Sequence, residues 1–202
     1  MSVHVPVMCA EALQWLRPER GGVFVDCTVG LGGHTRALLD GGATRVLGVD
    51  RDPQALALAG EALAAYGDRV SLVHADYRQV DAVLQAQGIE LLDGALADLG
   101  VSSLQFDAAG RGFSFMRDEP LDMRMDTTRG ISAAEWLAVV DERQLEKVIR
   151  DYGEERFAFQ IAKAIVARRA VEPISSTRQL AAIVANAVKT DRKSTRLNSS
   201  HT

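Results

Sequence analysis

An acidic residue followed by a glycine-rich turn is the first feature of this sequence that could do chemistry. Asp26 closes the short apolar run Val23–Asp26, and residues 27–34 (CTVGLGGH) then carry glycines at positions 30, 32 and 33. Glycine allows a turn to adopt positive φ and lets a ligand approach the main chain. A strand that ends in an acid and leads into such a turn is typical of nucleotide sites in α/β folds.

Further acidic residues stand at the ends of the later strand-like runs, namely Asp50, Asp76 and Asp98. A carboxylate at Asp50 can accept hydrogen bonds from both hydroxyls of a ribose. Asp76 and the neighbouring Tyr77 can meet the edge or face of an adenine, and Asp98 lies beside the switch point between the first and fourth strands. The joint pattern favours one nucleoside site over a set of solvent-exposed strand-end acids.

The residues around the turn narrow the choice of ligand. A nicotinamide dinucleotide would favour glycine at position 35, which is Thr35, and there is no GxxxxGK[ST] phosphate loop. The turn holds no cation for a phosphate, because Arg36 already lies in the following helix. An adenosyl ligand with a cationic sulfonium suits a cradle lined by Asp26, Asp50 and Asp98. We therefore expect S-adenosylmethionine, with a NAD-dependent oxidoreductase as the alternative.

Alternating strand and helix patterns must position these residues. Residues 6–17 predict a first helix, with Pro6 near its first turn. The strand-like runs are Val23–Asp26, Arg45–Asp50, Val70–His74 and Leu91–Leu99, separated by helical patterns. This alternation predicts an α/β fold with a parallel sheet of strand order 3-2-1-4 and right-handed crossovers.

The pattern changes after Leu99. Residues 100–131 lack periodicity but are rich in Phe, Met and Leu, which predicts an ordered, functional loop rather than disorder. Its arginines could bind phosphate while its aromatic rings stack on bases. Alternatively, the apolar residues dock the loop and the arginines pair with aspartates. The residues concerned are Arg111, Arg117 and Arg124, with Asp118, Asp122 and Asp126.

From residue 132 onward the pattern is helical. Ser132 with Glu135, and Ser176 with Gln179, have the spacing of capping boxes. Three apolar stripes at helical spacing predict a small helical subdomain. These stripes are Leu145, Val148, Ile149 and Tyr152, then Phe157, Ile161 and Ile165, then Leu180, Ile183, Val184 and Val188.

Composition limits the classes of function. The 202 residues are 47% hydrophobic, without an apolar run long enough for a membrane span and without a signal peptide, so we expect a cytoplasmic protein. Cys9 and Cys27 lack metal-site partners, so we expect reduced thiols and no metal. Residues 1–141 hold 11 Lys and Arg against 20 Asp and Glu, whereas residues 142–192 hold 10 against 7. Any electrostatic footprint for nucleic acid is therefore local.

Seven motifs in order resemble one family. They are HVPVM (4–8), DCTVGLGGHT (26–35), DRDPQ (50–54), DLGVSS (98–103), RGFSFMR (111–117), LDMRMD (121–126) and YGEERF (152–157). Over about residues 4–189 the chain is similar to the bacterial ribosomal RNA small subunit methyltransferase H family. That family methylates the N4 amine of a cytidine in the decoding region of 16S ribosomal RNA.

The resemblance implies a class I, Rossmann-like methyltransferase sheet that is interrupted after its fourth strand by a helical insertion. It implies a core over residues 1–105, an insertion over 106–190 and 16S ribosomal RNA in the small subunit as partner; a homodimer is left open. The family continues past residue 189 into further strands, so we expect an incomplete sheet and an artefactual or disordered tail over 191–202. The implied S-adenosylmethionine contacts are Gly32, Gly33, His34, Asp50, Tyr77, Asp98 and Gln105, with Tyr77 where relatives usually carry Phe.

The expected reaction is attack of the cytidine amine on the sulfonium methyl, with a protein group accepting a proton. We expect Asp98 and the backbone carbonyls around Leu99 and Gly100 in that role. Ser102, Ser103 and Gln105 are alternatives, because the usual Asn/Asp-Pro-Pro-Tyr motif is absent. For His34, contact through the backbone and contact through the ring are both open. A non-catalytic ribosome-assembly module is the second alternative function.

Overall fold

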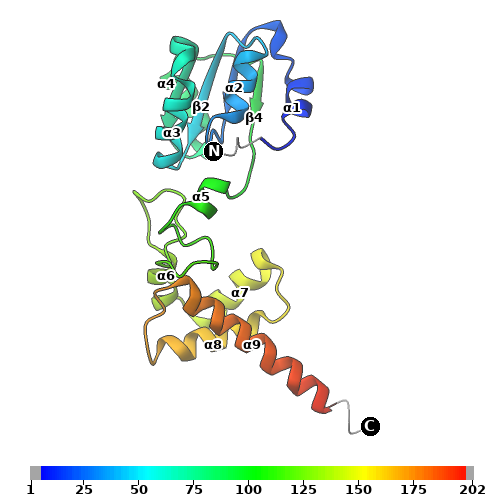
Figure 1. Cartoon of the computed structure of the whole chain (residues 1–202), viewed down its shortest axis with the longest axis vertical. Helices are drawn as coiled ribbons and strands as arrows, with labels where there is room; N and C mark the ends of the chain where they lie inside the picture. The colour runs from blue at the N-terminus through cyan, green and yellow to red at the C-terminus, as the bar shows by residue number, and fades with distance from the viewer. Residues whose placement is uncertain (1–5, 199–202) are drawn as a thin grey trace. The chain divides into compact units, whose positions relative to one another are not determined.

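The computed structural model describes the backbone of residues 6–198 and the side chains of residues 6–189. The chain divides into two compact units, one formed by Met1–Leu104 with Met125–Thr128 and the other by Gln105–Arg124 with Arg129–Thr202. The first unit contains the sheet and the second contains helices (Figure 1). The chain therefore crosses from one unit to the other after residues 104, 124 and 128.

The first unit is built on a parallel sheet of order β3-β2-β1-β4, which confirms the predicted α/β class and strand order. Its strands are β1 (Val23–Asp26), β2 (Arg45–Asp50), β3 (Val70–His74) and β4 (Gly94–Leu96). Only the middle of the predicted fourth run is a strand, and Leu91 and Leu99 are exposed. The strand packs closely at Gly94, where a Cβ would lie 2.7 Å from Leu16 Cδ2.

Four helices cover the sheet: α1 (Cys9–Leu16), α2 (Gly33–Asp40), α3 (Pro53–Leu63) and α4 (Val80–Ala86). Asp52 begins α3 by accepting a hydrogen bond from the Gln54 N–H, with proline at the first helical position. The first helix is shorter than predicted because Met8 and Arg17 adopt left-handed φ values of 52° at its two ends. Pro6 therefore lies outside the helix, contrary to the prediction.

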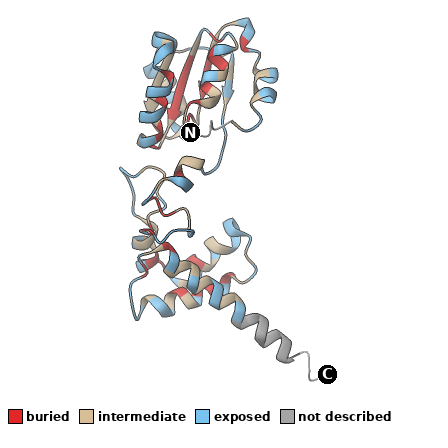
Figure 2. Cartoon of the chain, in the orientation of Figure 1, coloured by how far each residue is buried: buried red, intermediate tan, exposed pale blue. Residues whose placement is uncertain are grey.

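The core lies on both faces of the central strands, which are buried (Figure 2). Phe24 and Val46 pack with residues of α1 and α2, while Val25 and Leu47 pack with residues of α4. Neighbouring residues of a strand face opposite sides, so a fully apolar run is what a sheet covered on both faces requires. This packing fixes the carboxyl ends of β1 and β2, where the predicted site lies.

The second unit contains α6 (Ala133–Val139), α7 (Glu142–Gly153), α8 (Ala158–Arg169) and α9 (Thr177–Asn198). Both predicted capping boxes are present, at Ser132 with Glu135 and at Ser176 with Gln179. The apolar stripes predicted three helices, and α6 is a further one. Tyr152 was predicted in the buried stripe of α7, but it is 86% exposed in the last turn, outside the hydrophobic cluster.

The loop predicted over 100–131 is ordered and includes α5 (Ser103–Asp107). Pro120 forms a β-bridge with Ser176, the Leu121 N–H donates to the Ser175 carbonyl at 2.9 Å, and Leu121 is buried in the helical core. Part of the loop thus packs as an element of the helical unit.

The expected tail over 191–202 overlaps α9, whose backbone continues to Asn198. The side chains from residue 190 onward and all of residues 199–202 lie outside the described part of the chain. The foreign or disordered nature of the tail stays a prediction. Across the described helices, none combines the length and the apolar character needed to cross a bilayer.

Candidate cofactor site

The glycine-rich turn joins β1 to α2 with glycine where the backbone requires it. Gly30 and Gly32 have φ values of 53° and 83°, and a Cβ on Gly33 would lie 2.4 Å from Pro6 Cγ. Gly32 is the N-cap of α2 and supplies no side-chain hydrogen bond to the first turn. Backbone N–H groups at such a helix start can bind an anionic group of a ligand.

Asp26 is wholly buried and stabilises the turn by hydrogen bonds to residues of the turn and of α2. Its Oδ2 accepts a hydrogen bond from Thr35 Oγ1 at 2.7 Å, and its Oδ1 accepts one from the Thr28 N–H at 3.1 Å. Burial raises the pKa of the carboxyl, while the Thr35 hydrogen bond acts in the opposite direction. The prediction that Asp26 lines the cradle is therefore wrong, because a side chain with no exposed surface cannot meet a ligand from solvent.

Asp50 holds the turn from the neighbouring strand. Its Oδ2 accepts a hydrogen bond from the Gly30 N–H at 2.8 Å, and its Oδ1 accepts one from the Asp52 N–H at 2.9 Å. An ionised carboxylate has about four acceptor positions, so both oxygens keep the capacity to accept from a ribose. The side chain is only partly buried. Its role in cofactor binding stays a prediction.

Asp98 reaches the same turn through its backbone. β4 ends at Leu96, whose carbonyl accepts from the Cys27 N–H at 2.8 Å, and the Asp98 N–H donates to Thr28 Oγ1 at 2.7 Å. The side chain of Asp98 is exposed. The structure thus connects Asp50 and Asp98 to one glycine-rich turn.

Asp76 and Tyr77 follow β3. Both carboxylate oxygens of Asp76 bind the Arg78 guanidinium, at 2.9 and 2.7 Å, and this hydrogen bonding lowers the pKa of Asp76 to about 2. These bonds occupy part of the Asp76 carboxylate, and its contact with an adenine edge stays a prediction. Tyr77 is 38% exposed, so its ring offers a stacking surface.

His34 binds the chain that precedes α1. Its Nε2 lies 3.0 Å from the Val7 carbonyl oxygen, which can only accept, so this nitrogen donates. Of the two possibilities for His34, the geometry favours a ligand contact through its backbone. Gln105 is buried in α5 and belongs to the second unit, so its predicted contact stays a prediction.

Thr28 and Thr35 are the positions that sequence reasoning missed as parts of the site. Thr28 bridges Asp26 to Asp98, and Thr35 supplies the hydroxyl to the buried Asp26. From the sequence alone, Thr35 argues only against a dinucleotide. The available signal was a hydroxyl residue one turn into the helix after a strand-end acid.

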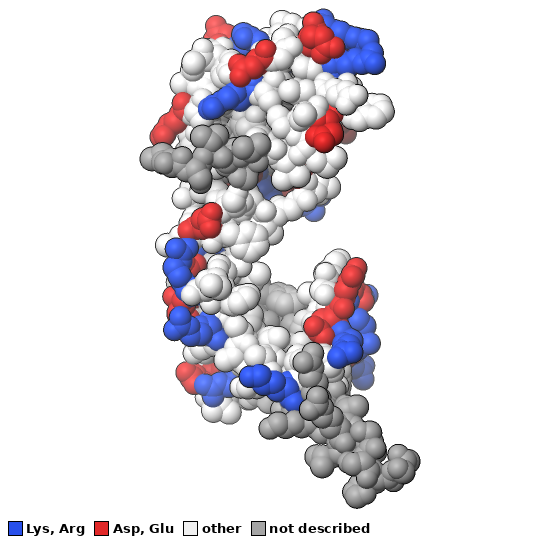
Figure 3. Space-filling view, turned by 45° about the vertical axis from the view of Figure 1, so that its right-hand side comes forward, with Lys and Arg blue, Asp and Glu red and all other residues white. Residues whose placement is uncertain are grey.

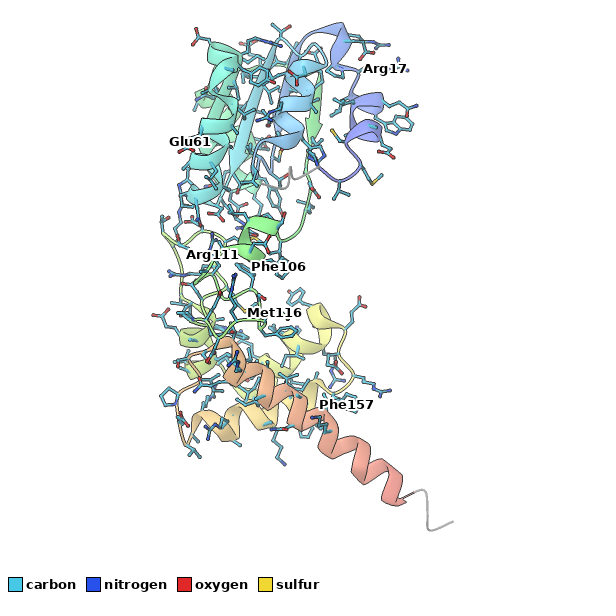
Figure 4. All side chains as sticks on the ribbon, in the orientation of Figure 1. Arg17, Glu61, Phe106, Arg111, Met116 and Phe157 are labelled. Atoms are coloured by element: carbon cyan, nitrogen blue, oxygen red, sulfur yellow. The ribbon has the colours of Figure 1, made fainter. Side chains whose placement is uncertain are left out.

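The arginines of the 111–126 segment take different roles. Arg124 binds Asp122 through two hydrogen bonds of 2.9 and 2.7 Å, whereas Arg117 binds Glu119 rather than an aspartate. Arg111 is buried and donates to the Arg124 carbonyl. Pairing with acidic residues thus accounts for Arg117 and Arg124. Figure 4 labels Arg111 and Met116 of this segment.

Apolar side chains remain exposed beside these ion pairs, notably Phe115 at 68% and Met116 at 81%. On the face shown in Figure 3, acidic and basic side chains of the helical unit are intermixed and form no patch of a single sign. An exposed ring among paired arginines can stack on a base, so nucleic-acid contact stays open for this segment.

Comparisons with known proteins give a consistent result. The family model described as the MraW methylase family matches residues 1–201. Ribosomal RNA small subunit methyltransferase H of Janthinobacterium sp. (strain Marseille) is 55% identical over 195 residues, which cover 94% of this chain and 60% of that protein. The protein of the same name from Bordetella petrii is 57% identical over 179 residues, covering 88% of this chain and 49% of its own length.

The chain therefore spans about half to three-fifths of the length of these relatives. Among solved structures, yhhF from Escherichia coli matches 40% of this chain and 46% of its own, with a TM-score of 0.34 and 17% identity.

Proposed function

The chain belongs to the MraW methylase family, and from this premise we propose that it forms part of an S-adenosylmethionine-dependent methyltransferase. The proposed substrate is the N4 amine of a cytidine in the decoding region of 16S ribosomal RNA, within the small ribosomal subunit in the cytoplasm. The observation that carries the proposal is the glycine-rich turn with Asp50 and Asp98 both bonded to it. Its curated relatives carry the name of a ribosomal RNA methyltransferase.

The groups at this edge fit the parts of the cofactor. The start of α2 at Gly32 and Gly33 offers backbone N–H groups to a carboxylate. Asp50 offers acceptors to ribose hydroxyls, and the exposed ring of Tyr77 offers a surface to adenine. When bound, S-adenosylmethionine would supply a methyl group attached to a positively charged sulfur.

Asp98 is the proposed acceptor for the proton that the substrate amine must lose. Its carboxylate is exposed, and its backbone is fixed to Thr28 of the turn. A carboxylate accepts a proton more readily than the hydroxyls of Ser102 and Ser103 or the amide of Gln105, and its charge would favour a cationic ligand nearby. A positioned base of this kind typically contributes about 10²–10⁴-fold to a rate.

The exposed ring of Phe115, among paired arginines, supports contact with a single-stranded segment of RNA. Such recognition stacks unpaired bases on aromatic rings, an interaction that is separate from the attraction between basic groups and phosphates. The intermixed charges of the helical unit are compatible with it.

Isothermal titration calorimetry with S-adenosylmethionine tests the cofactor site. We expect the chain to bind, and Asp50→Asn to raise the Kd about 10- to 100-fold, because hydrogen bonds to charged groups contribute about 1.5–3 kcal/mol. Asp40→Asn is the matched control, since the Asp40 carboxylate accepts from Tyr66 at the far end of α2. Equal affinity of the Asp50→Asn variant, with unchanged circular dichroism, would contradict the ribose assignment.

Two further titrations separate the alternatives. Binding of NADH in place of S-adenosylmethionine would favour an oxidoreductase. Transfer of a labelled methyl group to immature small subunits distinguishes an enzyme from a ribosome-assembly module, which would bind subunits without transfer.

A further inference from the structure

Four residues of the long loop return to the sheet. Met125–Thr128 belongs to the first unit, although the chain before and after it belongs to the second. We call this segment the return strap. Nothing in its composition marks it as part of the sheet unit, so its contacts identify its role.

The return strap is fastened to the ends of two neighbouring strands. His74 Nε2 lies 3.5 Å from Asp126 Oδ2 and donates to the Arg51 carbonyl oxygen at 3.1 Å. The guanidinium of Arg51 contacts the sulfur of Met125. The strap is therefore held from the residue after β2 and from the last residue of β3.

Asp126 is set in place by its own segment. Its Oδ1 accepts from the Thr128 N–H at 2.9 Å and from the Thr128 hydroxyl, which leaves Oδ2 on the side of His74. The side chain of Asp126 is 16% exposed and that of His74 is 33% exposed. Both side chains are therefore partly shielded from water.

The fastening lies next to the proposed adenosine contacts. His74 is the register partner of Asp50, and the Ala75 N–H donates to the Asp50 carbonyl at 3.0 Å. Register partners in neighbouring strands lie about 4.7–4.9 Å apart. Tyr77 follows His74 by three residues.

We propose that the return strap and the cofactor stabilise one another, with His74 and Arg51 as positioning residues for the adenosine side of the site. This inference rests on the proposed function. A fastened strap holds the ends of β2 and β3 in one arrangement. The protein therefore loses less conformational freedom when Asp50 and Tyr77 bind a ligand. By thermodynamic linkage, the bound ligand must then favour the fastened strap by the same factor.

The loop connection gives the coupling a second consequence. The chain enters the strap from Arg124 and leaves it to Arg129, and both residues belong to the helical unit. Fastening the strap fixes two of the points at which the helical unit is tied to the sheet. Cofactor binding would therefore restrict the attachment of the 111–124 segment, the proposed RNA-contacting part.

Hydrogen exchange and calorimetry on the same variants test the coupling. His74→Ala removes the part of the fastening that His74 makes and leaves the contact of Arg51 with Met125, while His74→Gln restores a side-chain N–H donor. Glu146→Gln removes an ion pair with Arg150 on α7 and is the matched control. S-adenosylmethionine is the probe, and exchange is followed in peptides that span residues 124–129.

We expect His74→Ala to speed exchange in the strap of the free protein and to raise the Kd for S-adenosylmethionine about three- to tenfold, the loss typical of one hydrogen bond. The cofactor should protect the strap in the parent chain and protect it less in His74→Ala. His74→Gln should recover most of both effects, and Glu146→Gln should match the parent chain.

The outcomes distinguish this inference from the function on which it rests. A faster-exchanging strap with an unchanged Kd in His74→Ala would reduce the strap to a structural clasp and overturn the coupling. Unchanged exchange in His74→Ala would overturn the fastening through His74 and the positioning role proposed for it. A parent chain that does not bind S-adenosylmethionine would refute the proposed function and the coupling with it, while the exchange of the free protein would still decide the fastening.

Discussion

The hydrogen bond between Thr35 and the buried Asp26 offers the sharpest test of how this site is held. Thr35→Val keeps the shape of the side chain and removes the hydroxyl that donates to Asp26 Oδ2 at 2.7 Å. Both residues have no exposed surface, so water cannot replace the lost donor. A buried acceptor left without its partner costs about 1–3 kcal/mol, more for a charged group. We expect a cost of about 2 kcal/mol at neutral pH.

The cost should depend on pH, because burial already raises the folded pKa of Asp26 above its ordinary value of 3.8. A raised folded pKa means that stability is full below the unfolded value and is lost as the pH rises through the folded value. Thr35 is the largest influence that lowers this pKa. Its removal raises the folded pKa further, so Thr35→Val should cost more at pH 7.5 than at pH 5.

Hydrogen exchange in peptides that cover residues 23–40 measures this effect in the sheet unit alone. A global melt would mix two units and need not be two-state. A loss of about 2 kcal/mol lowers protection about 30-fold at pH 7.5. Tyr66→Phe, which removes an exposed hydrogen bond to Asp40, is the control and should change protection less than threefold. Equal costs of Thr35→Val at both pH values would refute the inference that the Thr35 hydrogen bond lowers the folded pKa of the buried Asp26.

Two other predictions test the end of β3 and the helical core. Arg78 holds the pKa of Asp76 at about 2. The ionised Asp76 should therefore contribute to stability in full above pH 4, and this contribution should disappear as the pH falls through 2. Carboxyl titration by NMR should show the Asp76 pKa moving up toward 3.8 in Arg78→Gln, and an unmoved value would contradict the pairing. Leu145→Ala, at a position that is 2% exposed, should destabilise the helical unit by about 2–5 kcal/mol. Exchange in α8 peptides measures that loss, and a cost below 1 kcal/mol would place Leu145 outside the core.

The elements with local signals could be predicted from the sequence. β1, β2 and β3 begin and end at the predicted residues, because each is a short apolar run closed by turn-forming or acidic residues. The capping pair Ser132 and Glu135 likewise marks the start of α6, since both hydrogen bonds of a capping box form within four residues. Such features depend on neighbours in the chain, which a sequence displays.

Features that depend on distant partners could not be predicted. The ends of α1 are set by the left-handed backbone of Met8 and Arg17. Such a conformation is usually signalled by glycine, and neither position is a glycine. The contact of His74 with Asp126 joins residues that are 52 positions apart, and Asp126 lies in a segment without periodicity. The position of such a loop depends on its contacts with distant parts of the chain. Composition therefore predicts that the loop is ordered but does not predict where it packs.

Asp26 shows why the site was harder to predict than the fold. Asp26 and Asp50 are both acids at the ends of buried strands, and from the sequence each is an equal candidate for binding a ligand. The difference comes from their partners: Asp26 is buried with a hydroxyl from α2, whereas Asp50 receives backbone N–H groups and keeps part of its surface in solvent. A hydroxyl residue one turn into the helix that follows the glycines is therefore the signal that an acid before them supports the turn. Applied to this chain, that criterion assigns Asp26 to the framework and leaves Asp50 and Asp98 as the carboxylates available for chemistry.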